Sequence, residues 1–365
     1  MLAVLNIMMF IVPALVSLII HNYLRHGELS GKRKIVLFFV YFFLLNGITF
    51  AISYVRGVKG IRFSDMTFSY RLKYMSLGGV LGFVMPFVVA LITEDVITIG
   101  GFIRYERRFF RDLKKYNSYA VWSAKSDLKA EVASSYLNWM WWLIEPFCMM
   151  LIYSLIFGVF FKASEKYFSA FIFIGLTMWG FFSRTINGSV ATVRSAKNII
   201  TKVYIPKYII LFSKMLVNAF KMMVSFGVIV IMMIYYRVPI NWNVLWVIPI
   251  LLNLFLFTFG VGTIMMHYGV FVNDLGYITG IVLQMMMFLS GIFYSISKRV
   301  PEPFGEIIEM YNPMAFFISF VRSALLYGTS SSVLVFLVWA FISLVLISLG
   351  VFTIYSNENA YVKVI

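Results

Sequence analysis

Polar side chains that could handle an anionic ligand lie inside long apolar stretches of this sequence. Lys214, Asn218 and Lys221 recur at i, i+4 and i+7, which places them on one face of a helix. An ionisable group in apolar surroundings is costly and is therefore a candidate for function. The lysines could line a route for phosphates or acidic sugars. Alternatively, Lys214 has no such role, and its amine simply reaches water near the end of the helix. This explanation fits Lys221 less well, because Lys221 lies about 10 Å further into the membrane than Lys214.

A carboxylate and a guanidinium lie in two neighbouring apolar stretches. Glu145 follows a tryptophan cluster at 139–142 by one turn, and Arg184 lies toward the inner end of the next stretch. A pair between Glu145 and Arg184, or between Glu145 and a lysine, would lower the cost of both charges. Indole rings favour the headgroup level of a bilayer, so the tryptophans predict that a helix begins at an interface.

The motifs of several enzyme classes do not occur. The sequence has no phosphate-binding loop, no H-E-x-x-H, no G-x-S-x-G, and only three scattered histidines, so we predict neither catalysis nor a metal site. Its one cysteine excludes an intramolecular disulfide.

Composition predicts an all-α polytopic membrane protein, because 61% of the residues are hydrophobic, 13% are charged and the mean hydropathy is +0.89. The net charge of +16 resides in loops between apolar helices, which favours the positive-inside rule over nucleic-acid binding. The first apolar window is predicted to be a retained helix and not a cleaved signal peptide. Windows of about 20 residues lie near 2–20, 35–55, 76–99, 138–161, 167–190, 208–235, 244–271, 276–296 and 332–355.

Charge sets the predicted orientation and the domains. The stretch 101–135 carries eight Lys/Arg and four acidic residues, and the stretch 191–208 carries four Lys/Arg and no acidic residue. The positive-inside rule therefore places both stretches in the cytoplasm, and the number of spans that follow places the C-terminus there too. The N-terminus is then outside, although the basic stretch 56–75 conflicts with this. We predict a three-span module at 1–100, an amphipathic interface segment at 101–135, and a six-span domain at 136–365 with a re-entrant external segment at 297–331.

Residues 104–116 predict an amphipathic helix on the inner leaflet. Tyr105, Phe109, Leu113 and Tyr116 recur at helical spacing and would dip into the acyl boundary, with cations around the rest. Arg107, Arg108 and Arg111 could receive a phosphate-bearing lipid; the alternative is an ordinary surface anchor.

Two connecting segments complete the candidate sites. The stretch 194–204 predicts a short amphipathic helix, ended by Pro206, that either docks a separate motor subunit or is a plain interfacial helix. Prolines and glycines break 297–331 into short helices with Met314 to Phe320 half buried, as in a re-entrant lid. The residues assigned to docking are Asn198, Ile199, Lys202, Tyr204 and Pro206, and those assigned to an external gate are Tyr311, Asn312, Pro313 and Arg322.

Five segments in order resemble the membrane subunits of type-2 ABC exporters for polysaccharides, teichoic acids and O-antigens. They are SSYLNWMWWLIEPFCMMLIYSLIFGVFF (134–161), NIITKVYIPKYIILFSKMLVN (198–218), VNDLGYI (272–278), FLSGIFYSIS (288–297) and YNPMAFFISFVRSALLYG (311–328). The similarity spans about residues 104–355. The chain departs from the family pattern at Leu137-Asn138 and at Gly291, and residues 1–100 fall outside it.

The resemblance implies a mechanism and partners. Two copies of this chain would surround a channel in the cytoplasmic membrane of a bacterium and pair with two ATPase subunits. ATP and Mg²⁺ would bind to those subunits, with no cofactor on this chain. The cargo would be a lipid-linked glycan, and Trp139, Trp142 and Phe147 could stack on its sugar rings, although such aromatics also commonly face lipid or pack in a core.

Other classes stay open at this point. A type-2 exporter of a small amphiphile or drug has the same architecture. An ion-driven glycolipid flippase usually has more spans and internal repeats. A membrane glycosyltransferase should show interfacial acidic residues, for which Glu94-Asp95 is the one candidate pair.

Overall fold

The structure, a computed structural model, describes residues 10–18, 31–55, 99–133, 136–160, 165–301, 304–329, 332–358 and 361. All regular secondary structure in these ranges is helical, which confirms the predicted all-α class. The chain divides into two compact units, Met1–Arg104 with Val300–Ile307, and Tyr105–Arg299 with Ile308–Ile365.

The first unit contains a helix at residues 10–18 and α2, Gly31–Val55. Ala14, Tyr41 and Leu45 form a small buried core, and the Asn46 side chain donates to the carbonyl oxygens of Phe10 and Phe42 at 3.3 and 2.7 Å. Helix α2 coincides with the predicted second span. Most of the predicted third span lies outside the described residues, as do Glu94 and Asp95, so the three-span module stays a prediction.

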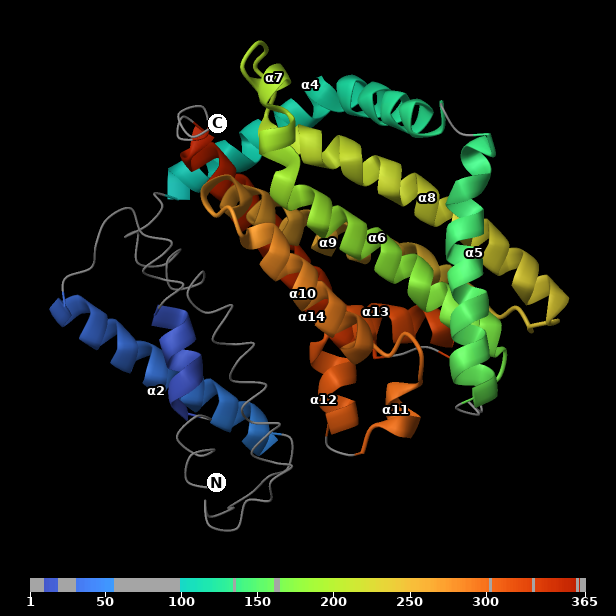
Figure 1. Ribbon diagram of the computed structural model, residues 1–365. Helices are drawn as coiled ribbons and strands as arrows, with labels where there is room; N and C mark the ends of the chain where they lie inside the picture. Colours follow the sequence, from blue (N-terminus) through green and yellow to red (C-terminus); the bar gives the residue numbers. More distant parts are fainter. Residues whose placement is uncertain are drawn as a thin grey trace. The chain divides into compact units, whose positions relative to one another are not determined.

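Five helices of the second unit are long and apolar enough to cross a membrane (Figure 1). They match five of the six spans predicted in 136–365. Their ranges are Trp141–Val159, α6 Phe168–Ser195, α8 Lys207–Tyr235, Trp242–Phe271 and α14 Val333–Ser356. The first consists of α5 Trp141–Tyr153 and a π-helical turn Ser154–Phe160, and the fourth of a 3-10 turn Trp242–Trp246 and α9 Val247–Phe271.

The remaining predicted span, at 276–296, is shorter than expected. Helix α10, Leu275–Leu289, has 15 residues and therefore extends only about 22 Å, less than the roughly 30 Å of hydrocarbon in a bilayer. The predicted range continued to residue 296, but the chain turns at Gly291, whose φ of +64° suits a residue without a Cβ.

Short helices follow that turn, as the prolines predicted. They are α11 Ile296–Arg299, α12 Phe304–Tyr311 and α13 Pro313–Arg322, which continues into a π-helical turn Ser323–Tyr327. Asn312 caps α13, because its Oδ1 accepts from the backbone amides of Met314 and Ala315 at 3.0 and 3.3 Å. The residues from Met314 to Ile318 are fully buried, so the prediction of a half-buried segment was wrong.

Helices α6, α9 and α14 pack side by side at the centre of the second unit. Small residues allow the close approach: Gly269 of α9 lies against the backbone of Val190 in α6, and Gly350 of α14 faces Thr263 of α9. In the most apolar stretch of α6, 72% of the residues are buried, against 6% in α5. Helix α5 thus exposes most of its surface.

Gly269→Ala is expected to destabilise this centre. An added Cβ would clash with the Val190 carbonyl oxygen, so a backbone must shift, at a cost of about 1–3 kcal/mol. Thermal unfolding of the purified protein in detergent measures the effect. Gly180→Ala is the matched control, since its Cβ would meet no atom of the described residues within 4 Å, and an equal loss in both variants would contradict the packing argument.

Candidate substrate cleft and coupling region

The interface segment forms one long helix, α4, Ile99–Val132. Its aromatic stripe packs on the protein: Phe109 is 7% exposed with its ring centre 5.1 Å from that of Tyr208, and the Tyr105 ring stacks on Tyr355 at 5.5 Å. The prediction that these aromatics dip into lipid was therefore wrong. The physical reason is that tyrosines near the start of α8 and the end of α14, Tyr208 and Tyr355, cover the stripe.

The three arginines predicted to receive a phosphate lie in two environments. Arg107 and Arg111 lie on the exposed surface of α4, and the Arg111 side chain is 76% exposed. Arg108 turns inward: its Cζ lies 4.3 Å from the centre of the Tyr355 ring, and its Nη2 lies 3.3 Å from Glu358 Oε2. Arg108 is thus engaged by protein groups, whereas the other two face outward.

Arg108 belongs to a network that joins α4, α8 and the end of α14, here called the interhelical clasp. Lys207 Nζ lies 3.4 Å from Glu358 Oε1, and the Tyr355 hydroxyl donates to Asp112 Oδ2 at 2.9 Å. Lys207 is only 3% exposed, so its pairing with Glu358 offsets part of the cost of burying the amine. The clasp consists of Arg108, Asp112, Tyr204, Lys207, Tyr208, Tyr355 and Glu358.

The predicted docking helix is shorter than expected. Helix α7 covers only Lys197–Ile200 and is followed by turns, because Pro206 and the extended residues before it prevent α8 from starting earlier than Lys207. Residues 197–204, here called the coupling tip, project at one end of the unit beside α4 (Figure 1).

The coupling tip presents apolar side chains to its surroundings. Ile199, Val203 and Tyr204 are 43%, 57% and 51% exposed, and Asn198 and Lys202 are also exposed. Pro206 is buried beneath them. Val203 was not among the assigned docking residues, although its place one turn after Ile199 could have indicated it.

The tip is fastened to α4 through one residue. The Arg108 guanidinium donates to the Tyr204 hydroxyl, and the Tyr116 hydroxyl donates to the Tyr204 carbonyl oxygen at 3.4 Å. Burial and the nearby Glu358 carboxylate raise the pKa of Tyr204, so it stays a neutral hydroxyl. Side-chain contacts thus join the tip to α4 and, through the clasp, to α8 and the end of α14.

A cleft of about 430 Å³, with both apolar and charged side chains in its wall, lies between the C-terminal part of α4, α6 and α8. Two of the three residues predicted on α8, Lys214 and Asn218, line it. Lys214 Nζ donates to Ser195 Oγ at 3.0 Å, and Asn218 Nδ2 donates to Thr185 Oγ1 at 3.1 Å. The cleft residues include Asp127, Glu131, Arg184, Thr185, Lys214 and Asn218.

Two ion pairs border this cleft. Arg184 Nη2 lies 3.1 Å from Glu145 Oε1, which confirms the predicted pair between α6 and α5. Lys221 Nζ lies 2.6 Å from Glu131 Oε2 and joins α8 to α4. The pKa of Asp127, in the same region, is raised above its ordinary value. Burial is the main cause and Glu131 adds to it, and together they outweigh the opposing effect of Lys214. Lys214 differs from the other two cations because its hydrogen-bond acceptor is a neutral hydroxyl.

Of the three aromatics assigned to substrate, Trp142 alone lies beside these charges. Its ring centre is 5.9 Å from Lys221 Nζ, within reach of a cation–π contact, and 5.8 Å from the Phe220 ring. Trp139, in the 3-10 turn Asn138–Met140 before α5, and Phe147 of α5 are 53% and 43% exposed.

The residues assigned to the gate lie at the other end of α6 from the coupling tip (Figure 1). Arg322 is 4% exposed and donates to the carbonyl oxygens of Phe171, Gly291 and Ile292 at 3.0, 2.7 and 2.8 Å. Asn312 Nδ2 donates to the Leu289 carbonyl oxygen at 3.2 Å. Pro313 is the first residue of α13 and Tyr311 the last of α12. Arg322 and Asn312 thus hold α13 against the turn after α10.

The sequence profile of the ABC-2 type transporter family matches residues 121–326, which is more than half of the chain and includes the cleft, the coupling tip and the gate. The chain belongs to the ABC-2 type transporter family. It is a multi-pass ABC-2 permease domain, which typically lacks an ATPase, with further helices before it. The family implies a separate ATPase partner.

Three curated relatives are similar to this ABC-2 permease, and each is named O-antigen export system permease protein RfbA. The protein from Myxococcus xanthus is 25% identical over 207 residues, which are 57% of this chain and 80% of the relative. One from Klebsiella pneumoniae is 28% identical over 204 residues, 56% of this chain and 78% of the relative. A second protein from Klebsiella pneumoniae is 27% identical over 190 residues, which are 52% of this chain and 73% of the relative.

These matches confirm the family that the five sequence segments indicated. The domain boundaries and the roles assigned to individual residues stay predictions.

Proposed function

We propose that this ABC-2 permease moves a lipid-linked polysaccharide, of the O-antigen, teichoic acid or capsule type, across the cytoplasmic membrane of a bacterium. The observation that carries the proposal is the similarity to three O-antigen export permeases over 73–80% of their lengths. ATP hydrolysis in a separate subunit, which also binds Mg²⁺, supplies the energy.

The α4–α8 cleft suits the head of such a cargo. A lipid phosphate needs a cation whose existing partner is easily replaced, and Lys214 donates to the neutral hydroxyl of Ser195. Trp142 lies beside the cleft, where its flat face could stack on a sugar ring. The same ring also suits the headgroup level of the membrane. Arg107 and Arg111 on exposed α4 would raise the local concentration of anionic lipid.

Two copies of the chain would form the transport path. Helix α5 has a single fully buried residue, Met150, and exposes several apolar side chains that a second copy covers in this proposal. Each copy would receive one ATPase subunit at its coupling tip, which sets the orientation: the tip and the C-terminus face the cytoplasm, and α11 and α13 face outward. With three spans in 1–100, the N-terminus lies outside.

The test is reconstitution of the full chain with its ATPase in vesicles that contain lipid-linked glycan. ATP-dependent appearance of glycan on the far side, measured by a lectin or antibody, is the expected result. Transport of a small amphiphile but not of glycan would favour a drug-type ABC-2 exporter, and glycan movement driven by an ion gradient without the ATPase would overturn the proposal.

Lys214→Met is expected to slow glycan export about 10-fold or more, because a charge-assisted hydrogen bond to phosphate contributes about 1.5–3 kcal/mol. Methionine preserves the length of the side chain, so the helix packing should persist. The initial rate of export at matched protein levels is the measurement. Lys125→Met, which removes an exposed cation of α4, is the control, and equal rates for the two variants would exclude the assigned role of Lys214.

A further inference from the structure

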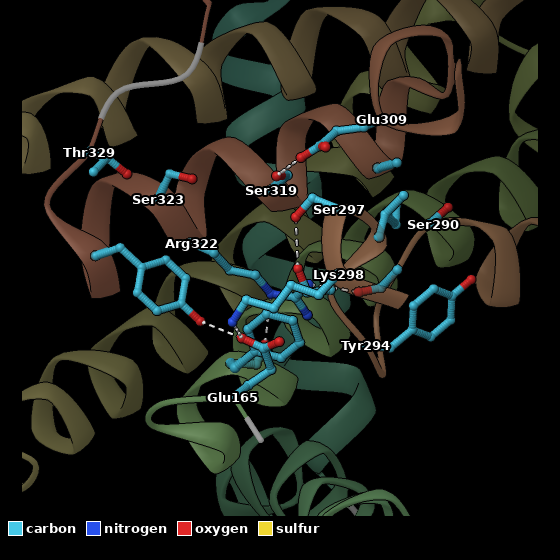
Figure 2. A pocket seen from close by; sticks show the side chains of 16 residues that line it. Glu165, Ser290, Tyr294, Ser297, Lys298, Glu309, Ser319, Arg322, Ser323 and Thr329 are labelled. Carbon is cyan, nitrogen blue, oxygen red and sulfur yellow. Dashed lines mark hydrogen bonds and ion pairs between the residues drawn. The ribbon is translucent and has the colours of Figure 1, made fainter. Parts of the chain in front are cut away.

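A second cavity, of about 300 Å³, lies at the end of the unit opposite the coupling tip. It is bordered by Glu165 before α6, by the turn from Ser290 to Lys298, and by α13 with the turn that follows it (Figure 2). Helix α6 has 28 residues, so its two ends, and with them this cavity and the coupling tip, lie about 40 Å apart. We call this cavity the hydroxyl pocket.

Hydroxyl groups are frequent in the wall of this pocket: eight of its sixteen lining residues are serine, threonine or tyrosine. Several already bond to protein atoms, as the Ser290 hydroxyl does to the Met286 carbonyl oxygen, but a hydroxyl that donates one hydrogen bond can still accept others. A wall of this kind therefore suits a ligand that itself carries many donors and acceptors.

The charges of the pocket cancel. Glu165 Oε2 lies 2.7 Å from Lys298 Nζ, and the Glu165 side chain is 6% exposed. Glu309 accepts a hydrogen bond from the Ser319 hydroxyl, and Arg322 supplies the second cation (Figure 2). Both cations are already engaged, Lys298 by Glu165 and Arg322 by three backbone carbonyl oxygens, so a phosphate would find no cation with a neutral, replaceable partner such as Lys214 has in the cleft. A metal ion would meet the two cations. A neutral polyhydroxylated ring avoids both conflicts and can use carboxylates as acceptors and cations as donors.

The pocket is held in shape by its own framework. Three backbone carbonyl oxygens fix the Arg322 guanidinium, which also lies 3.4 Å from the centre of the Phe171 ring. The Tyr327 hydroxyl reaches Glu165 Oε2 at 3.4 Å. Because these groups are already positioned, a ligand need not order them on binding.

We propose that the hydroxyl pocket binds one neutral sugar residue of the exported glycan on the outer side of the membrane. The proposal rests on the proposed function for its orientation and substrate class. A pocket of this volume accommodates a single ring, and exposed polar contacts of this kind give weak binding, with a dissociation constant on the order of 1 mM. Weak binding suits a moving chain, since each sugar must also leave.

Binding can be tested without transport. Saturation-transfer difference NMR on the purified full chain in detergent would use D-glucose, D-mannose, N-acetyl-D-glucosamine and L-rhamnose as probes, with inorganic phosphate as a competitor. We expect a saturable signal from at least one sugar that phosphate does not displace. Silence from all four sugars, or displacement by equimolar phosphate, would overturn the proposal.

Two variants locate the binding site. Glu309→Gln removes a carboxylate acceptor and Ser323→Ala removes a hydroxyl, and each should weaken the sugar signal at least fivefold while leaving the thermal midpoint near that of the parent. Glu106→Gln, the same exchange on α4, is the matched control. Full binding in both pocket variants would place the sugar elsewhere and refute the assignment.

The readouts separate this proposal from the proposed function. Glu309→Gln should slow glycan export severalfold while the ATPase still co-purifies. If the reconstituted complex exports glycan but the pocket variants bind and export normally, the pocket proposal fails and the function stands. If sugars bind as expected and no glycan is exported, the proposed function fails instead.

Discussion

Arg322→Met is expected to destabilise the second unit by about 3–5 kcal/mol. The guanidinium is 4% exposed and is the donor for three carbonyl oxygens, those of Phe171, Gly291 and Ile292. Removal of the donor leaves three acceptors enclosed and uncompensated, and each costs about 1–3 kcal/mol before relaxation. The measurement is the thermal midpoint and the yield of monodisperse protein in detergent.

Lysine should rescue Arg322 only in part. A single ammonium cannot reproduce the planar fork that reaches three carbonyls and lies over the Phe171 ring, so Arg322→Lys should still lose more than half of the stability lost in Arg322→Met. Arg299→Met, at the exposed end of α11, removes the same charge and should change stability by less than about 0.5 kcal/mol. Equal losses at positions 299 and 322 would mean that charge, and not the hydrogen-bonded position, matters.

The features that sequence predicted best depend on local signals. Runs of apolar residues located the long helices because a helix must satisfy its own backbone in hydrocarbon. The pair of Glu145 with Arg184 followed from the cost of isolated charges in adjacent spans, and the break at Asn312-Pro313 followed from the tendency of proline to interrupt a helix. The long helices and the break need only a residue and its neighbours along the chain, and the ion pair needs only two consecutive spans.

The features that were missed depend on what covers a surface. Periodicity showed that Phe109 and Tyr105 share a face of α4, but not that tyrosines of α8 and α14 cover it. Arg108 meets Glu358 across 250 positions of sequence, a separation at which no local spacing rule applies. The same holds for the contacts of Arg322: the carbonyl oxygens to which it donates belong to Phe171, Gly291 and Ile292, at least 30 positions away.

The double variant Ile199→Asp/Val203→Asp is expected to abolish co-purification with the ATPase and, with it, ATP-dependent export. These side chains are 43% and 57% exposed at the coupling tip, and an apolar anchor in an interface contributes about 2 kcal/mol or more. Two buried carboxylates would add a desolvation cost, so affinity should fall more than 100-fold. Pull-down of the ATPase with the tagged permease measures this directly.

Controls distinguish loss of contact from loss of structure. Thr201→Asp places one of the same charges on the exposed tip between the two anchors, and should weaken binding by less than tenfold if apolar contact is what the partner requires. Retained pull-down in the double variant would move the docking site away from the tip. Tyr204 is left intact here because its hydroxyl joins the tip to Arg108.

The clasp then predicts a different phenotype from the tip. Glu358→Gln removes the carboxylate with which both Arg108 and Lys207 pair, but it leaves the exposed anchors Ile199 and Val203 unchanged. The ATPase should therefore still bind while export per ATP hydrolysed falls, because motion of the tip is no longer transmitted to α8 and α14. If Glu358→Gln instead lost the ATPase as completely as the tip variant, the clasp would belong to the docking surface and would not act as a mechanical link behind it.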